Sequence, residues 1–138
     1  SLGVPQHGSG SGQYCRAAAR DATLALWETS DPPDAVFAGN DHMAFAVMDT
    51  LRGELGLSVP DDVSVVGYDD VPLASWGAYE LTTWRQPSDR MVIETVACLL
   101  RRIRDPGAHP RTITVPGQLV VRSSAKVPED WAGSGITQ

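Results

Sequence analysis

The sequence predicts an α/β fold built on a parallel sheet, and three observations support this prediction. Residues 35–38 and 63–67 are short apolar runs without polar alternation, which is typical of strands buried on both faces. A helical pattern at 41–56 lies between them. The joins on both sides of that helix are short. Strand, helix and strand in this order form a βαβ unit, so the two strands are expected to be parallel with a right-handed crossover.

The remaining elements extend this unit along the chain. Ser11 is expected to cap a first helix that begins at Gly12 or Gln13, and the Pro32-Pro33 pair ends it because proline cannot continue a helix. The later elements expected are a strand at 81–85, a helix at 88–104, and two last strands at 112–115 and 119–122. Apolar residues cover well over half of the 88–104 helix, so we expect it to contact two surfaces.

Length and charge limit the class of protein. The chain has 138 residues, enough for one domain with a core, and its 42% hydrophobic residues are a globular value. The net charge of −6 argues against nucleic-acid contact by these residues, because phosphate contacts need clustered lysine and arginine. The one basic cluster, Arg101-Arg102-Arg104, is expected at a helix C-terminus, where cations suit the helix dipole.

Cysteine usage and hydropathy indicate the compartment. Cys15 and Cys98 are far apart and form no CxxC motif, so we expect both to be reduced and buried as small apolar residues. No apolar run reaches the roughly 18 residues of a membrane span, and no signal-peptide pattern is present. These features favour a cytoplasmic protein without membrane contact.

Polar corners follow the two buried strands. Asn40 and Asp69 come directly after them, at the edge where open α/β sheets bind ligands. The Asn40 side chain could cap the next helix or contact a ligand, and both interpretations stay open. A carboxylate such as Asp69 can accept hydrogen bonds from two adjacent hydroxyl groups of a polyol. We expect neither a metal nor a cofactor, because no His or Cys stands at ligand spacing from the aspartates.

Four motifs resemble those of the LacI/GalR family of bacterial transcription regulators. Their order and spacing also match the family, over roughly residues 11–124. The motifs are Gly39-Asn40-Asp41-x-Met43-Ala44, the run 59–70 (VPDDVSVVGYDD), Leu81-Thr82-Thr83-x-Arg85-Gln86-Pro87, and the run 119–124 (LVVRSS).

The resemblance implies an architecture larger than this chain. Family members have a helix-turn-helix headpiece, a hinge helix and a two-lobed core, and an effector between the lobes changes operator affinity. This chain resembles the second half of that core: a three-layer parallel-sheet lobe of the periplasmic-binding-protein-like (type I) fold, as an incomplete fragment. Residues 1–86 are expected to form the C-terminal lobe, 87–117 to pack on the missing N-terminal lobe, and 118–138 to form a return strand and tail.

The missing lobe leaves the apolar face of the 88–104 helix without its partner. Three outcomes are expected for this face: cover by another copy of the chain, cover by the same lobe in a changed position, or disorder.

The resemblance also assigns roles to individual residues. The residues expected to bind the effector are Asn40, Asp69, Gln86, Trp84 and His7. Gln86 matches a position that reaches the cleft, and His7 stands where many members place an aromatic residue. Trp84 could stack on a sugar ring or simply fill space.

A homodimer interface is expected at Phe45 and Trp76. Phe45 lies off the predicted core face of its helix, and an outward aromatic residue suggests a protein contact. Trp76 stands in a loop beside small residues, and in the family these two regions meet their symmetry mates. We therefore predict an isologous two-fold dimer.

The predicted function is effector sensing and dimerisation within a LacI-type regulator, with a carbohydrate as the effector. Operator DNA would be bound only through the headpiece. The alternative is a sugar-binding protein of a transport system, which shares the core fold. An enzyme ranks last, because no nucleophile, base and orienting group can be assembled from these residues.

Overall fold

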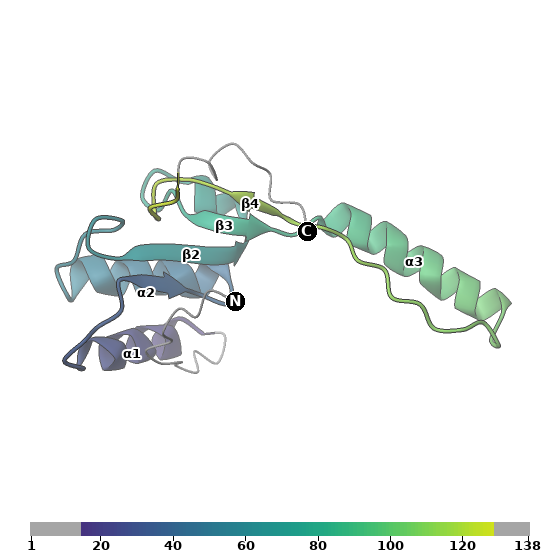
Figure 1. Cartoon of the computed structure of the whole chain (residues 1–138), viewed down its shortest axis with the longest axis horizontal. Coiled ribbons are helices and arrows are strands. Elements are labelled where there is room, and N and C mark those ends of the chain that lie inside the picture. The colour runs from purple at the N-terminus through teal and green to yellow at the C-terminus, as the bar shows by residue number, and fades with distance from the viewer. Residues whose placement is uncertain (1–14, 129–138) are drawn as a thin grey trace.

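The computed structural model describes residues 15–128, which form helices and a sheet with one projecting helix (Figure 1). The elements in chain order are α1 (Arg16–Trp27), β1 (Ala35–Phe37), α2 (Asp41–Gly53), β2 (Ser64–Asp69), the 3-10 helix η1 (Pro72–Ser75), β3 (Thr82–Arg85), α3 (Ser88–Arg104) and β4 (Gln118–Val120).

The sheet has the strand order β1-β2-β3-β4. The first three strands are parallel, with Val36 opposite Val65 and Gly67 opposite Thr83. This confirms the predicted βαβ unit. The last strand runs antiparallel to β3, with Thr83 opposite Val120, so the sheet is mixed.

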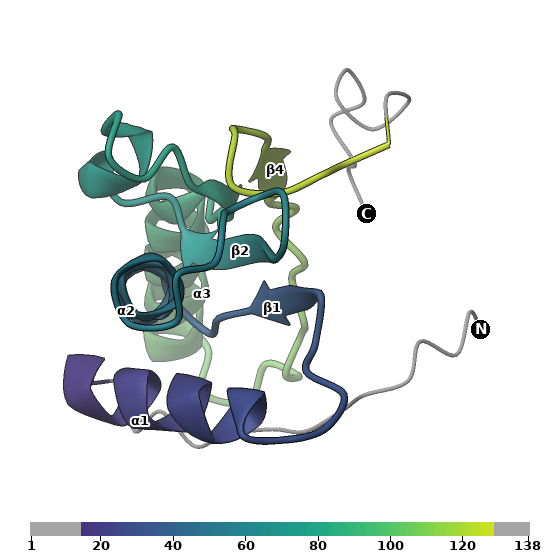
Figure 2. The same ribbon diagram turned by 90° about the vertical axis from the view of Figure 1, so that its left-hand side faces the viewer.

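The core lies between α2 and one face of the sheet. Met48, Leu51, Val65 and Leu81 are fully buried there. Figure 2 shows α2 along this face, with α1 beside it. The helix comes close to β2 at Gly67, where an added Cβ would overlap Asp41 Oδ1 and lie 2.8 Å from Leu81 Cδ2. Glycine is therefore required at this contact between helix and strand.

The opposite face of the sheet has no helix over it within residues 15–128. Phe37 points to that side and is 67% exposed, whereas its neighbour Val36 packs on the core. The predicted fold class, a sheet with helices, is confirmed. Three layers were predicted, and residues 15–128 form two of them, the sheet and one layer of helices.

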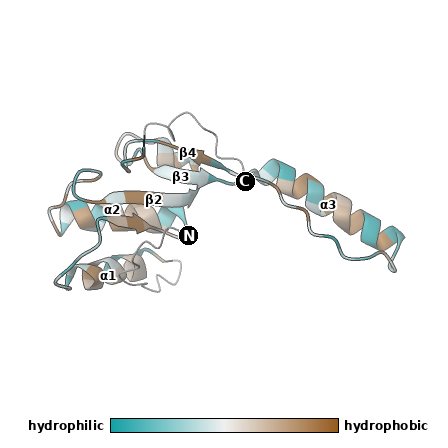
Figure 3. Cartoon of the chain, in the orientation of Figure 1, coloured by the Kyte–Doolittle hydropathy of each residue, from teal (hydrophilic) through white to brown (hydrophobic). Residues whose placement is uncertain are grey.

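Helix α3 begins and ends at the predicted residues, Ser88 and Arg104, but it points away from the sheet (Figure 1). None of its residues is buried. The ribbon of α3 alternates between brown, hydrophobic stretches and teal, hydrophilic ones in Figure 3. Its large apolar side chains are 41–66% exposed; they are Met91, Val92, Ile93, Val96, Leu99, Leu100 and Ile103. The predicted contact with two surfaces is therefore not made within the described part of the chain.

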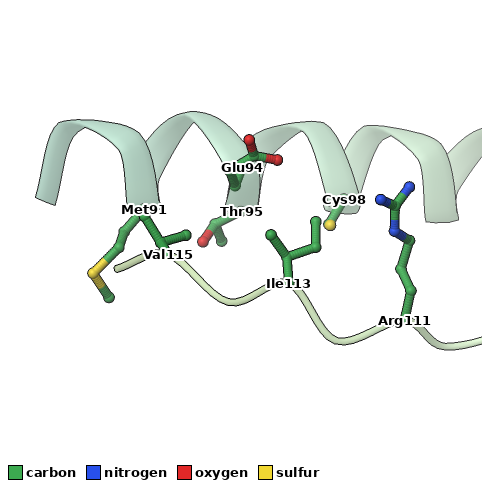
Figure 4. A pocket seen from close by; sticks show the side chains of 7 residues that line it. All are labelled: Met91, Glu94, Thr95, Cys98, Arg111, Ile113 and Val115. Atoms are coloured by element: carbon green, nitrogen blue, oxygen red, sulfur yellow. The ribbon is translucent and has the colours of Figure 1, made fainter. Parts of the chain in front are cut away.

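The segment that returns from α3 runs alongside it without forming a strand. A cavity of about 340 Å³ separates the helix from residues 111–115, with Met91 and Cys98 on one side and Ile113 and Val115 on the other (Figure 4). The strand predicted at 112–115 is wrong, because a strand needs a hydrogen-bonded neighbour and residues 15–128 provide none there.

Three other predicted details differ from the structure. The first helix begins at Arg16, because Cys15 is extended and its Sγ accepts a hydrogen bond from Ala18 N–H at 3.4 Å. Cys15 is consequently exposed and not a buried apolar residue. The predicted cap Ser11 lies outside the described residues. The final strand is Gln118–Val120, one residue earlier at its start than predicted.

Candidate functional site

The candidate site lies where β1 and β2 end. Ala38 N–H donates to the Val66 carbonyl at 2.9 Å, so the two parallel strands finish at the same edge of the sheet. The polar residues Asn40 and Asp69 follow at this edge, as the sequence predicts. Such an edge is where open α/β sheets hold ligands.

Asn40 caps α2. Its backbone is extended, with φ −156°, and its Oδ1 accepts a hydrogen bond from Met43 N–H at 2.8 Å. The cap therefore uses the carboxamide oxygen. The Asn40 amide nitrogen has no hydrogen-bond partner among residues 15–128, and the side chain is only half-buried. The two interpretations of Asn40 are thus compatible, since one end of the group caps the helix and the other remains a donor.

Asp69 and Gln86 are brought together from different strands. Gln86 Nε2 donates to Asp69 Oδ1 at 2.6 Å. Asp69 is the last residue of β2, and it lies opposite Arg85, which immediately precedes Gln86. Two of the predicted effector residues are therefore neighbours, and the second oxygen of Asp69 has no donor within the described residues.

Asp70 is held by two arginines. Its Oδ2 accepts from Arg85 Nε and its Oδ1 from Arg122 Nη2, both at 2.6 Å, while its side chain is only 6% exposed. Burial alone would raise the pKa of Asp70, but the hydrogen bonds from Arg122 and Arg85 outweigh it and lower that pKa. The structure thus makes Asp70 the centre of an ion-pair network.

Asp41 is a fully buried carboxylate beneath the site. It accepts hydrogen bonds from Thr83 Oγ1 at 2.5 Å and from Val71 N–H at 2.8 Å. Burial raises the pKa of Asp41 above its usual range, and the nearby charges of Asp69 and Asp70 raise it further. Asp41 therefore joins the start of α2 to β3 and to the corner that follows β2.

Of the other two predicted effector residues, Trp84 packs against the returning chain, and His7 cannot be compared with the site. Trp84 is half-buried, and its indole nitrogen lies so close to Gly117 that a Cβ there would overlap it. This packing favours the interpretation that Trp84 fills space. His7 lies outside the described residues.

The predicted dimer residues differ in exposure. Phe45 was expected to point away from the core, and this is wrong: it is 4% exposed and its ring lies 4.3 Å from that of Tyr79. The reason is that the loop after β2 returns over α2 and covers a second side of the helix. Trp76, in contrast, is 62% exposed.

Sequence reasoning missed four residues that organise the site: Asp41, Thr83, Arg85 and Arg122. All four act through side-chain contacts between segments distant in the sequence. A weak signal was available, because Arg85 and Arg122 both stand inside the quoted motifs as the charges opposite to Asp70.

The arrangement offers hydrogen-bonding groups that a polar ligand could use. The Asp69 carboxylate can accept from hydroxyl or N–H groups, and the Asn40 amide can donate. Within residues 15–128 there is no group of three His, Cys, Asp or Glu residues placed to hold a metal ion. None of the helices described here is long and apolar enough to cross a membrane.

Comparison with known proteins places this fold in a family. Residues 3–125 match the periplasmic binding protein-like domain. The HTH-type transcriptional repressor PurR of Vibrio vulnificus strain CMCP6 is 41% identical over 103 residues, which are 75% of this chain and 30% of the repressor. The chain belongs to the periplasmic binding protein-like family, and it corresponds to part of the effector-binding domain of LacI/GalR-type regulators.

Solved structures agree with this assignment. The transcriptional regulator CelR in complex with cellobiose superposes with a TM-score of 0.73 at 33% identity, over 80% of this chain and 34% of CelR. A LacI family regulator from Enterococcus faecium with bound ribose gives 0.68 at 28% identity, over 81% of this chain and 41% of the regulator. The chain thus spans about a third of the length of these relatives, which are transcription regulators.

Proposed function

We propose that this chain is the effector-sensing and dimerising part of a LacI-type DNA-binding regulator. The observation that carries the proposal is the hydrogen bond between Asp69 and Gln86 at the ligand-facing edge of the sheet. At the same edge of the sheet, the amide nitrogen of Asn40 has no partner within residues 15–128 and would serve as a donor to a ligand.

A carbohydrate is the ligand class that we propose. The Asp69–Gln86 pair presents acceptors and donors within a small area, which suits adjacent hydroxyl groups. Two structural relatives hold cellobiose and ribose, which supports the same class. The resemblance to a repressor favours a regulator over a transport protein.

The proposed arrangement of the whole protein follows the family. Residues 1–86 belong to the C-terminal lobe, and 87–117 pack on the N-terminal lobe. Residues 118–138 return as a strand and tail. Operator DNA is contacted through a headpiece outside this chain, and the protein works in the cytoplasm. The exposed Trp76 supports the proposed homodimer interface, whereas the buried Phe45 does not.

Ligand-induced thermal stabilisation of the whole gene product tests the function. The compounds are ribose, cellobiose, sucrose, adenine and guanine. A ligand present at one hundred times its Kd stabilises the folded state by about 2.7 kcal/mol, which is a shift of several degrees in Tm.

Two variants show whether the stabilisation comes from the proposed site. Asp69→Asn keeps the size of the side chain but removes a charged acceptor worth about 1.5–3 kcal/mol, so the Kd should rise about tenfold or more. Asp49→Asn is the matched control, because Asp49 pairs with Arg16 on an exposed surface of α2. Equal ligand affinity in both variants would refute the proposed site.

A further inference from the structure

The corner after β2 has an unusual backbone. Asp69 has φ 121° and Asp70 has φ 57°, both positive in residues other than glycine. Aspartate tolerates the left-handed region better than most residues, but 121° lies well beyond the usual +50° to +70°. Such a conformation persists only where the surrounding contacts hold it. The position of the Asp69 carboxylate therefore depends on the contacts that hold this backbone conformation.

These contacts come from the two residues that follow Asp69. The buried Asp70 carboxylate is fixed by Arg85 on β3 and by Arg122 beyond β4, at 2.6 Å each. Arg122 is itself fixed, because its Nη1 donates to the Leu81 carbonyl at 2.6 Å. Val71 N–H donates to Asp41 at the start of α2. The backbone leaving Asp69 is thus tied to three other segments.

The same network also places Gln86. Arg85 lies opposite Asp69 in the sheet and is bonded to Gln86 in the chain. Since the Arg85 side chain is held by Asp70, the strand end that carries Gln86 is held as well. Both members of the Asp69–Gln86 hydrogen bond therefore depend on one carboxylate that takes no part in it.

We propose that Asp70 is a positioning residue of the effector site, which sets the Asp69 carboxylate and the Gln86 amide in the geometry that meets the ligand. Asp70 acts through Arg85 and Arg122 and does not touch the effector. This inference rests on the proposed function, because it assigns a second, indirect role within the same site.

The first test needs no ligand. In the ¹⁵N-labelled whole gene product, the side-chain amide of Gln86 gives its own NMR signal, and its bond to a carboxylate shifts that signal and slows hydrogen exchange. The Asp70→Asn variant should move the Gln86 signal and speed its exchange about tenfold. The Asp69→Ala variant, which has no acceptor, shows where the Gln86 signal lies when the pair is broken. Asp49→Asn should leave the Gln86 signal where it is in the original protein.

A purely structural role would give a different result. In that case Asp70→Asn lowers the unfolding temperature, but the Gln86 signal keeps its position and exchange rate, and the proposal is overturned. If Asp70→Asn does not fold, Arg85→Gln carries the test, because the Arg85 side chain is 52% exposed and lies at the rim of the network. It should move the Gln86 signal in the same direction.

The second test measures ligand affinity, using whichever of the five compounds stabilises the whole gene product. Asp70→Asn should raise its Kd about tenfold, while Asp49→Asn leaves the Kd unchanged. If Asp69→Asn weakens binding and Asp70→Asn does not, only the proposal about Asp70 is overturned. If Asp69→Asn itself has no effect on affinity, the proposed function fails and takes this inference with it.

Discussion

Replacing Gly67 with alanine tests how closely the first turn of α2 must approach the sheet. No left-handed φ is recorded for Gly67, so alanine suits the backbone and would by itself stabilise the strand by about 0.5–1 kcal/mol. The added Cβ, however, would overlap Asp41 Oδ1 and lie 2.8 Å from Leu81 Cδ2. The backbone effect and the packing effect therefore have opposite signs.

The packing effect is the larger of the two. Overpacking a close contact costs about 1–3 kcal/mol. Moving the Asp41 carboxylate also strains its hydrogen bonds with Thr83 and Val71, and a bond to a charged group contributes about 1.5–3 kcal/mol. With about 2 kcal/mol for packing, about 2 for one weakened bond and about 1 regained from the backbone, Gly67→Ala should lower the free energy of unfolding by about 3 kcal/mol.

Urea denaturation followed by circular dichroism measures this change. With an m value of about 2 kcal/mol/M, the midpoint should fall by about 1.5 M. Gly53→Ala is the matched control, because Gly53 ends α2 with open space around it and should be unchanged or slightly stabilised. A Gly67→Ala midpoint at or above that of the original protein would refute the argument that a close contact with Asp41 requires glycine.

Three further predictions concern single side chains. Asn40→Ala should lower the free energy of unfolding by about 1 kcal/mol through loss of the cap on α2, whereas Asn40→Asp keeps a capping oxygen and replaces the amide donor with a charged acceptor. Ligand affinity that falls in Asn40→Asp without loss of stability would separate binding from capping; unchanged affinity would leave Asn40 as a cap alone. The pKa of Asp70 is lowered in the folded state, so its stabilisation is present above the unfolded value near 3.8 and is lost as the pH falls through the folded pKa. The difference in unfolding free energy between the original protein and Asp70→Asn should therefore shrink at acid pH, and a difference that stays constant from neutral pH to below the folded pKa would contradict this. Trp76→Asp should weaken a homodimer measured by sedimentation, and an unchanged dimer affinity would exclude Trp76 from the interface.

Local patterns predicted the elements that depend on local physics. The apolar runs at β1 and β2, the helix between them and both ends of α3 agree with the structure. Asn40 was recognised as a possible cap because capping depends on the few residues around it. The position of Asn40 and Asp69 at one edge of the sheet could be predicted because parallel strands end at the same edge.

Contacts between distant segments could not be predicted in the same way. Phe45 looked exposed because helical periodicity describes one packed face, while the Tyr79 loop supplies a second. Residues 112–115 have strand-like composition, but a strand also needs a partner. Asp70 and Arg122 are 52 positions apart, and nothing in either local pattern links them.

Helix α3 is joined to the sheet through a narrow connection at Arg85 and Gln118, which we call its root. Arg85 and Gln118 pair side by side where the chain leaves the sheet and where it comes back. Within residues 15–128, these two strand ends are the connection between the sheet and the helix. Its 17 residues extend about 25 Å beyond them. By simple geometry, a rotation of roughly 10° at that root moves the far end of the helix by about 4 Å. Because this root lies beside Gln86, any rotation there of that size would move the far end of α3 by more than the length of the Asp69–Gln86 hydrogen bond, which is 2.6 Å.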